Sequence, residues 1–157
     1  MSAASGFVIE RDDLSDPATQ ALVRLHLEGM QASSPPGSVF AFDLSGLRAD
    51  GVMVWTLREG GAPIGMGAPR VLGDGSGEVK SMRTHPGHLR RGVGAALLEH
   101  VIAEARGLGL RRLSLETGSG PAFEPALALY RRRGFVDGAA FGGYVKSAFN
   151  QFLHLEL

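Results

Sequence analysis

The chain of 157 residues contains no cysteine, and this absence excludes several kinds of chemistry. Disulfide bonds, cysteine-ligated zinc and thiol nucleophiles all require that residue. The five histidines, at positions 26, 85, 88, 100 and 154, form no H-E-x-x-H pattern. Each is more typical of a structural side chain than of a metal ligand. We therefore expect no metal cofactor.

Two further features are missing from the sequence. No run of 18 apolar residues is present, so no helix is expected to span a membrane. The opening residues, Met-Ser-Ala-Ala-Ser-Gly, lack the charged and apolar blocks of a signal peptide. Neither sign of charge is in excess, because 16 Lys and Arg balance 16 Asp and Glu. We expect a cytoplasmic protein with no nucleic acid or membrane partner.

The composition suits one globular unit. Apolar residues make up 44% of the chain, which is enough for a sizeable core. The length fits one core and is short for two full domains. The sequence shows no internal repeat, low-complexity tract or convincing linker. Residues 1–157 are therefore expected to form a single domain.

Apolar periodicity and the placement of Gly and Pro predict the order of elements. Ser15 or Asp16 should cap a first helix that begins with Pro17, and Gly60-Gly61 should form a hairpin turn. This order predicts an α+β fold of three layers, in which a mixed sheet carries helices on both faces. Strands are expected at 7–10, 52–59, 64–72, 78–84, 113–117, 135–136 and 150–157, helices at 17–31, 92–106 and 123–132, and a loop or short helix at 38–49.

The most informative segment runs from Glu78 to Ile102 and reads as a strand, a short basic loop and a helix. The first turn of a helix has free N–H groups and the positive end of the helix dipole. Gly92 and Gly94 let an anion approach that backbone closely. Arg90 and Arg91 add positive charge. The segment predicts a pyrophosphate cradle, and with it a cofactor that contains a nucleotide.

Two common nucleotide-binding motifs do not fit this loop, because Leu97 stands at the third glycine of a Rossmann fingerprint and no Walker A run is present. The residues from Leu89 to Gly94 instead resemble the acyl-CoA-binding motif of the GNAT superfamily of N-acetyltransferases, Q/R-x-x-G-x-G/A. Leu89 departs from the usual Gln or Arg. Ala126 to Phe135 is similar to the family's downstream motif, A-x-x-L-Y-x-x-x-G-F. With both motifs in order, the chain is identified as a member of this superfamily.

The resemblance implies a GNAT-like fold, whose mixed, mostly antiparallel sheet has two splayed strands that form a wedge for acyl-CoA. Here those strands are 78–84 and 113–117. Backbone groups of Met82 and Thr84 are expected to pair with the pantetheine arm of acetyl-CoA. Phe123 stands where many members carry an asparagine, so an apolar contact is expected there. The implied cofactor contacts are Met82, Arg83, Thr84, Leu89, Arg90, Arg91, Gly92, Val93, Gly94, Ala95, Phe123, Ala126, Tyr130 and Arg133.

Acetyl transfer to an amine needs a base and assistance to the leaving group. An amine with a pKa of ~10.4 is protonated at pH 7, and freeing its lone pair costs ~4–5 kcal/mol. A general base can accept that proton directly or through a water. Glu78 sits where many family members carry such a carboxylate, and Glu116 on the partner strand is the other candidate. The motif places Tyr130 beside the CoA sulfur, where its hydrogen bond would strengthen as charge develops.

In this superfamily the acceptor usually meets the first helix, the loop after it and the segment between the last two strands. Here these are residues 26–42 and 138–149. His26, Phe40, Phe141 and Tyr144 are the candidate substrate contacts, and they suggest an aromatic-lined pocket.

We expect acetyl transfer from acetyl-CoA to the primary amine of a small molecule, by direct attack in a ternary complex. Two alternatives stay open: a protein or peptide acetyltransferase that modifies a lysine or an N-terminus, and a non-catalytic acyl-CoA-binding module. Small members of the superfamily often pair, so a homodimer is a further expectation.

Overall fold

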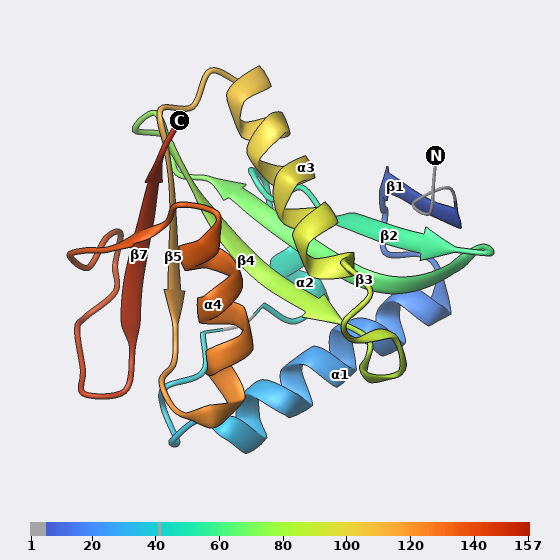
Figure 1. Cartoon of the computed structure of the whole chain (residues 1–157), viewed down its shortest axis with the longest axis horizontal. Helices are drawn as coiled ribbons and strands as arrows, with labels where there is room; N and C mark the ends of the chain where they lie inside the picture. Colours follow the sequence, from blue (N-terminus) through green and yellow to red (C-terminus); the bar gives the residue numbers. More distant parts are fainter. Residues whose placement is uncertain (1–5, 41) are drawn as a thin grey trace.

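A seven-stranded sheet forms the middle layer of the protein (Figure 1). The computed structural model describes residues 6–40 and 42–157. The strand order is β1-β2-β3-β4-β5-β7-β6, and every neighbouring pair is antiparallel except the parallel pair β4 and β5. The strands are β1 (Phe7–Arg11), β2 (Trp55–Glu59), β3 (Ala62–Val71), β4 (Ser76–Thr84), β5 (Arg112–Thr117), β6 (Val136–Asp137) and β7 (Gln151–Glu156).

Helices cover both faces of this sheet, as the sequence predicts (Figure 1). One face packs against α1 (Pro17–Ser33) and α2 (Leu44–Leu47), which contribute Leu22, Val23 and Leu47 to a cluster with Met66 and Ala68 of β3. The other face packs against α3 (Val93–Gly107) and α4 (Glu124–Arg132), which bury Leu98, Val101 and Leu127 against Leu113 and Leu115 of β5. The α+β three-layer fold is therefore confirmed.

The local signals hold at most element ends. Asp16, rather than Ser15, caps α1, because its Oδ1 accepts a hydrogen bond of 2.9 Å from the Ala18 N–H. The helix runs on to Ser33, since no breaker precedes Pro35. The strand expected from position 52 begins only at Trp55, because Val52 forms no more than an isolated bridge with Arg70.

The helix expected at 123–132 is divided into a 3-10 turn, Pro121–Phe123, and α4. A second 3-10 turn, Pro86–His88, lies between β4 and α3. Gly134 follows α4 with φ at +109°, a conformation that favours glycine and ends the helix as predicted.

The central strands part where the sequence predicts a wedge. β4 and β5 pair only at Ser76–Arg112, Gly77–Leu113 and Glu78–Ser114. Beyond these pairs β4 continues to Thr84 alongside β3, and β5 continues to Thr117 alongside β7. The two inner edges therefore diverge, and their backbone groups beyond Glu78 and Ser114 are not paired with each other.

A β-bulge lies in β4 at this point. Ser81 has a φ of +56°, and the pairing with β3 shifts between Met66 and Ala68. A bulge inserts one extra residue, bends its strand and changes the face on which the following side chains lie. Within residues 6–40 and 42–157, none of the helices has the length and hydropathy that a membrane span requires.

Candidate active site

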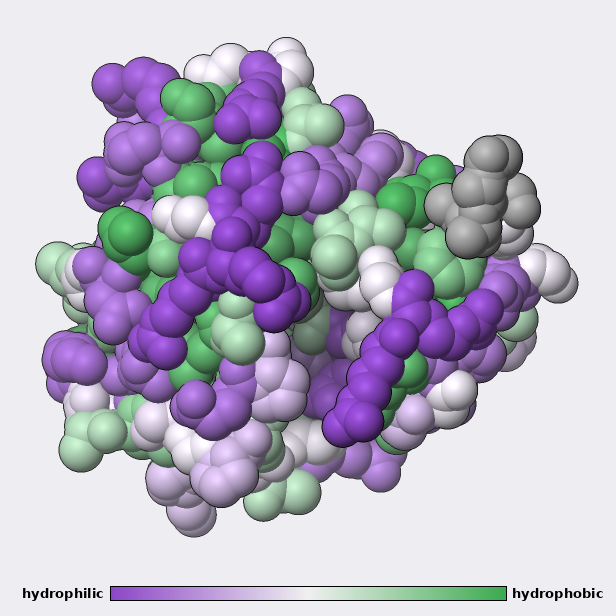
Figure 2. Space-filling view, in the orientation of Figure 1, coloured by the Kyte–Doolittle hydropathy of each residue, from purple (hydrophilic) through white to green (hydrophobic). Residues whose placement is uncertain are grey.

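A cavity of about 560 Å³ occupies the wedge between β4 and β5. Figure 2 shows this face of the molecule hollowed between α4 and the loop that precedes α3. The wall comes from β4, β5, α1, α4 and the start of α3. The predicted site residues that line it are His26, Phe40, Met82, Arg83, Thr84, Leu89, Arg90, Gly94, Glu116, Phe123, Ala126 and Tyr130.

The start of α3 offers free backbone donors to this cavity. Gly92 is the N-cap with φ at +82°, and no side chain caps the helix. The first intrahelical bond runs from the Ala96 N–H to the Gly92 carbonyl at 3.0 Å. The N–H groups of Val93, Gly94 and Ala95 therefore have no intrahelical partner. Together with the helix dipole they suit the pyrophosphate of acetyl-CoA.

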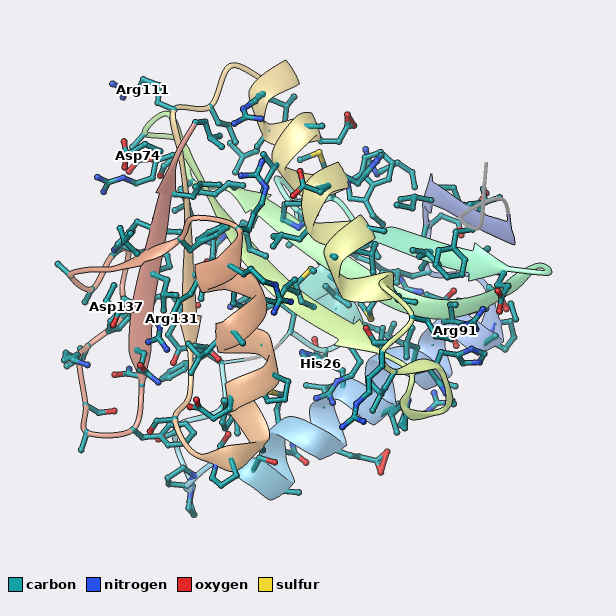
Figure 3. The ribbon with its side chains drawn as sticks, in the orientation of Figure 1. His26, Asp74, Arg91, Arg111, Arg131 and Asp137 are labelled. Atoms are coloured by element: carbon teal, nitrogen blue, oxygen red, sulfur yellow. The ribbon has the colours of Figure 1, made fainter. Side chains whose placement is uncertain are left out.

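The basic side chains near this helix end differ in what they contact. Arg90 lines the cavity. Arg91 instead forms an ion pair with Glu59, whose Oε1 lies 2.9 Å from Arg91 Nη1, and Figure 3 shows it on the β2 side of the loop. This pairing lowers the pKa of Glu59. The guanidinium of Arg133 is bound to Glu99 of α3. Of these three arginines, Arg90 is thus the one whose side chain lines the cavity.

Tyr130 projects from α4 into the same wedge and is 6% exposed. Its ring packs edge-on against Phe135 at 5.6 Å between centroids. Burial raises the pKa of Tyr130 well above its ordinary value, and no described residue forms a hydrogen bond with the hydroxyl. The hydroxyl is therefore protonated at neutral pH and has a proton to donate to a ligand.

Glu78 lies deeper and does not line the cavity. Its carboxylate is 2% exposed and accepts hydrogen bonds from the Tyr144 hydroxyl and, at 3.4 Å, from Lys80 Nζ. Lys80 also lies 2.8 Å from the Tyr144 oxygen and 4.7 Å from the centroid of the Phe42 ring. Burial and the bond to Glu78 raise the pKa of Tyr144, so this hydroxyl donates.

Lys80 is a residue that the sequence analysis overlooked. It stands two residues after Glu78 in the same strand, and residues i and i+2 of a strand share a face. The same spacing on β5 puts Ser114 and Glu116 on one face. A charged residue two positions from a candidate base in a strand was the signal that could have identified Lys80.

Glu116 lines the cavity and is half-buried. Burial raises its pKa to about 7 from an ordinary value of 4.5; the positive charge of Lys80 opposes this, and the negative charge of Glu78 adds to it. A carboxylate with this pKa exchanges protons near neutral pH, which is the range a general base needs.

The acceptor candidates lie on the α1 side of β4. His26 of α1 is 6% exposed, and its Nδ1 accepts a hydrogen bond of 2.9 Å from Arg83 Nε. Burial, with the charges of Arg83 and Lys80, lowers the pKa of His26 to about 4, so the ring is neutral. Phe40 packs edge-on against Tyr144 at 5.4 Å, and Phe141 does so at 5.2 Å from outside the cavity. No group of three or more metal-binding side chains occurs among the described residues.

Comparison with known proteins places these features in a family. The model of the Acetyltransferase (GNAT) family matches residues 19–135, which include β4, the loop before α3, and α4. The chain is 44% identical to the uncharacterized N-acetyltransferase YedL of Escherichia coli (strain K12), over 96% of this chain and 95% of that protein. It is 36% identical to an IAA acetyltransferase of Azospirillum brasilense, over 78% of this chain and 80% of that protein.

Solved structures show the same fold. A putative acyl-CoA N-acyltransferase from Klebsiella pneumoniae superimposes with a TM-score of 0.81 and 28% identity, covering 96% of this chain and 97% of that one. A GNAT family acetyltransferase from Elizabethkingia anophelis, with acetyl-CoA bound, gives a TM-score of 0.72 at 17% identity, covering 97% and 99% of the two chains.

Proposed function

The chain belongs to the GNAT family of acetyltransferases, and from that premise we propose that it transfers an acetyl group from acetyl-CoA to the primary amine of a small molecule. The observation that carries the proposal is a single cavity lined by both Glu116 and Tyr130. One is a carboxylate with a pKa of about 7. The other is a protonated phenol without a protein partner among the described residues. Amine acylation needs one group to accept a proton and another to stabilise the leaving thiolate.

The residues present fit acetyl-CoA, which supplies the activated thioester. The free N–H groups of Val93, Gly94 and Ala95, with Arg90 beside them, would hold the pyrophosphate. The inner edge of β4 at Met82 and Thr84 is not paired with β5 and would hydrogen-bond to the pantetheine amides. Phe123 and Ala126 would pack against the apolar part of that arm.

Glu116 is the better candidate for the base. It faces the cavity, whereas the Glu78 carboxylate is fully buried and already accepts two hydrogen bonds. In the proposed step Glu116 takes a proton from the acceptor ammonium, directly or through a water. The amine nitrogen then bonds to the acetyl carbon as the carbon–sulfur bond breaks, and the second proton, which the nitrogen loses on becoming an amide, passes to the departing thiolate directly or through a water. Tyr130 donates a hydrogen bond to the sulfur, which leaves with the bonding electrons.

A small acceptor suits this geometry better than a protein segment. The acceptor would share this cavity of about 560 Å³ with the pantetheine arm, because Met82, Thr84 and Phe123 line the same space, and the room left for it is small. Phe40 lines the α1 side of the cavity, where the acceptor would enter, and the ring of Tyr144 packs edge-on against it. Because one relative is named an IAA acetyltransferase, IAA belongs among the acceptors to be tested.

The test is to mix the protein with acetyl-CoA and a panel of amines, IAA and lysine- or N-terminus-bearing peptides, and to follow thiol release with a thiol-reactive dye. The protein has no cysteine, so it contributes no background. Release with small amines that falls sharply in Glu116→Gln and Tyr130→Phe would support the proposal, and Glu28→Gln is an exposed matched control. Release with peptides alone would assign a protein acceptor. Calorimetric binding of acetyl-CoA without release from any acceptor would indicate a binding module.

A further inference from the structure

Arg83 carries a charge in the cavity wall that no carboxylate balances. Its Nε donates to His26 Nδ1 at 2.9 Å, and its Nη2 lies 3.5 Å from the His26 carbonyl oxygen. Burial alone lowers the pKa of Arg83, and no acidic group of the described residues counters this effect. The segments outside the described ranges, residues 1–5 and 41, contain no Asp or Glu.

Arg58, another poorly exposed arginine of this chain, does have carboxylate partners. Arg58, with a side chain 15% exposed, lies 3.0 Å from a carboxylate oxygen of Asp12 and 2.9 Å from one of Asp16. Removing a guanidinium from water without a counter-charge is costly. A partly buried cation with no such partner, placed on a cavity wall, is therefore poised to bind an anion.

The other charged groups near Arg83 do not neutralise its positive charge. Lys80 is matched by Glu78 at 3.4 Å. The His26 ring is neutral, and its Nδ1 holds the guanidinium in position by accepting the hydrogen bond from Nε. The α1 side of the cavity thus has a positive charge at Arg83 that no carboxylate neutralises. Glu116, on β5 across the cavity, is then available to accept the proton of the amine.

The side chain of Arg83 points toward α1, away from the end of α3 that is proposed to hold the cofactor phosphates, so the guanidinium is placed for a different anion. Its Nη2 sits next to Gly29 of α1, where an added Cβ would come within 2.9 Å of it. The free N–H groups of α3 belong to the opposite layer of the fold (Figure 1). In Figure 3 His26, the partner of Arg83, lies on α1 beside the end of β4.

We propose that Arg83 binds a carboxylate of the acceptor, so that the substrate is an amine that also carries a carboxylate group. A guanidinium presents parallel N–H donors that match the two oxygens of a carboxylate. The inference rests on the proposed amine acetylation, because it names the chemical class of the acceptor in that reaction. It gives the site two anchors, Arg83 for the carboxylate and Glu116 for the amine.

The first experiment compares matched acceptors: phenylalanine with phenethylamine and phenylalaninamide, and glycine and β-alanine with methylamine and ethylamine. The carboxylate-bearing member of each pair should have a kcat/KM about 10- to 100-fold higher. In Arg83→Gln the members of each pair should converge, whereas the exposed control Arg24→Gln should keep the preference. Equal turnover of charged and neutral acceptors by the wild type would overturn the inference and leave the acetyltransferase proposal intact.

The second experiment needs no turnover. Phenylacetate is titrated calorimetrically into protein saturated with CoA. Wild type and Arg24→Gln should bind it, Arg83→Gln should bind it at least about 10-fold more weakly, and the affinity for CoA should be the same in all three. Absent or Arg83-independent phenylacetate binding, or a loss of CoA affinity in Arg83→Gln, would overturn the inference. Arg83-dependent binding without thiol release from any acceptor would support the anion site and count against the acetyltransferase proposal.

Discussion

The Tyr144 hydroxyl donates a hydrogen bond to the Glu78 carboxylate across 66 positions of sequence. The bond joins the loop between β6 and β7 to the strand that forms one side of the wedge. Lys80 contacts both groups, and Phe40 and Phe141 pack against the tyrosine ring. The loop is therefore held against β4 by a small polar cluster of Tyr144, Glu78 and Lys80.

Tyr144→Phe should destabilise the protein by about 1–3 kcal/mol, because it leaves the buried Glu78 carboxylate short of a donor. Urea denaturation measures the change in the free energy of unfolding. Phe141→Leu, which perturbs the same aromatic cluster without removing a hydrogen bond, is the comparison. A change smaller than about 0.5 kcal/mol in Tyr144→Phe would show that Lys80 alone satisfies Glu78.

Glu116→Gln should remove one limb of the pH–rate profile. In the wild type kcat/KM should rise with pH through about 7, as the Glu116 carboxyl loses its proton and becomes able to act as a base. The second rise, from the acceptor amine itself, should remain in the variant. The measurement is kcat/KM from pH 5.5 to 9.5 with one acceptor, and a limb near pH 7 that survives in Glu116→Gln would point to another base.

Tyr130→Phe should separate activity from stability. The hydroxyl has no protein partner among the described residues, so its loss should change the free energy of unfolding by less than about 0.5 kcal/mol. Loss of a hydrogen bond that forms on the leaving sulfur should lower kcat by about 10²-fold or more. Steady-state kinetics with calorimetric binding of acetyl-CoA tests both. A variant with unchanged kcat would remove Tyr130 from the mechanism.

His26 should make the fold sensitive to acid. Its pKa is lowered to about 4 from 6.5, so between these values the unfolded chain binds a proton that the native state does not. Stability is therefore lost as pH falls from about 6.5 to about 4, by roughly 3 kcal/mol from this group. Denaturation at a series of pH values should show a shallower decline in His26→Gln. Parallel profiles for the two proteins would contradict a buried neutral histidine.

The parts of the fold that the sequence predicts best depend on local signals. Gly92 and Gly94 identify the start of α3, and Asp16 with Pro17 identifies the start of α1. The two layers of helices followed from the predicted order of elements, the wedge followed from the resemblance to the family, and the structure confirms both. The roles of the individual site residues stay predictions.

The remaining features depend on contacts between residues far apart in sequence. Arg91 was expected to add charge at the pyrophosphate, but its side chain pairs with Glu59, 32 positions away. The pattern of apolar and polar residues in neither segment predicts the ion pair between Arg91 and Glu59. The Tyr144–Glu78 bond is of the same kind. Such contacts are decided by how strands and loops pack, so single-segment patterns do not reveal them.

The bulge at Ser81 carries a consequence for specificity. By simple alternation Arg83 would share a face with Val79, which packs under α3 and α4. The inserted residue turns the strand so that Arg83 lies beside His26, on the face of Lys80. In the proposed role of Arg83, the extra residue at this bulge decides whether the guanidinium faces the acceptor side or the α3 side of the sheet. On the same proposal, a chain that lacked this one residue would turn the guanidinium toward α3 and α4 and lose the carboxylate contact, although no side chain had been replaced.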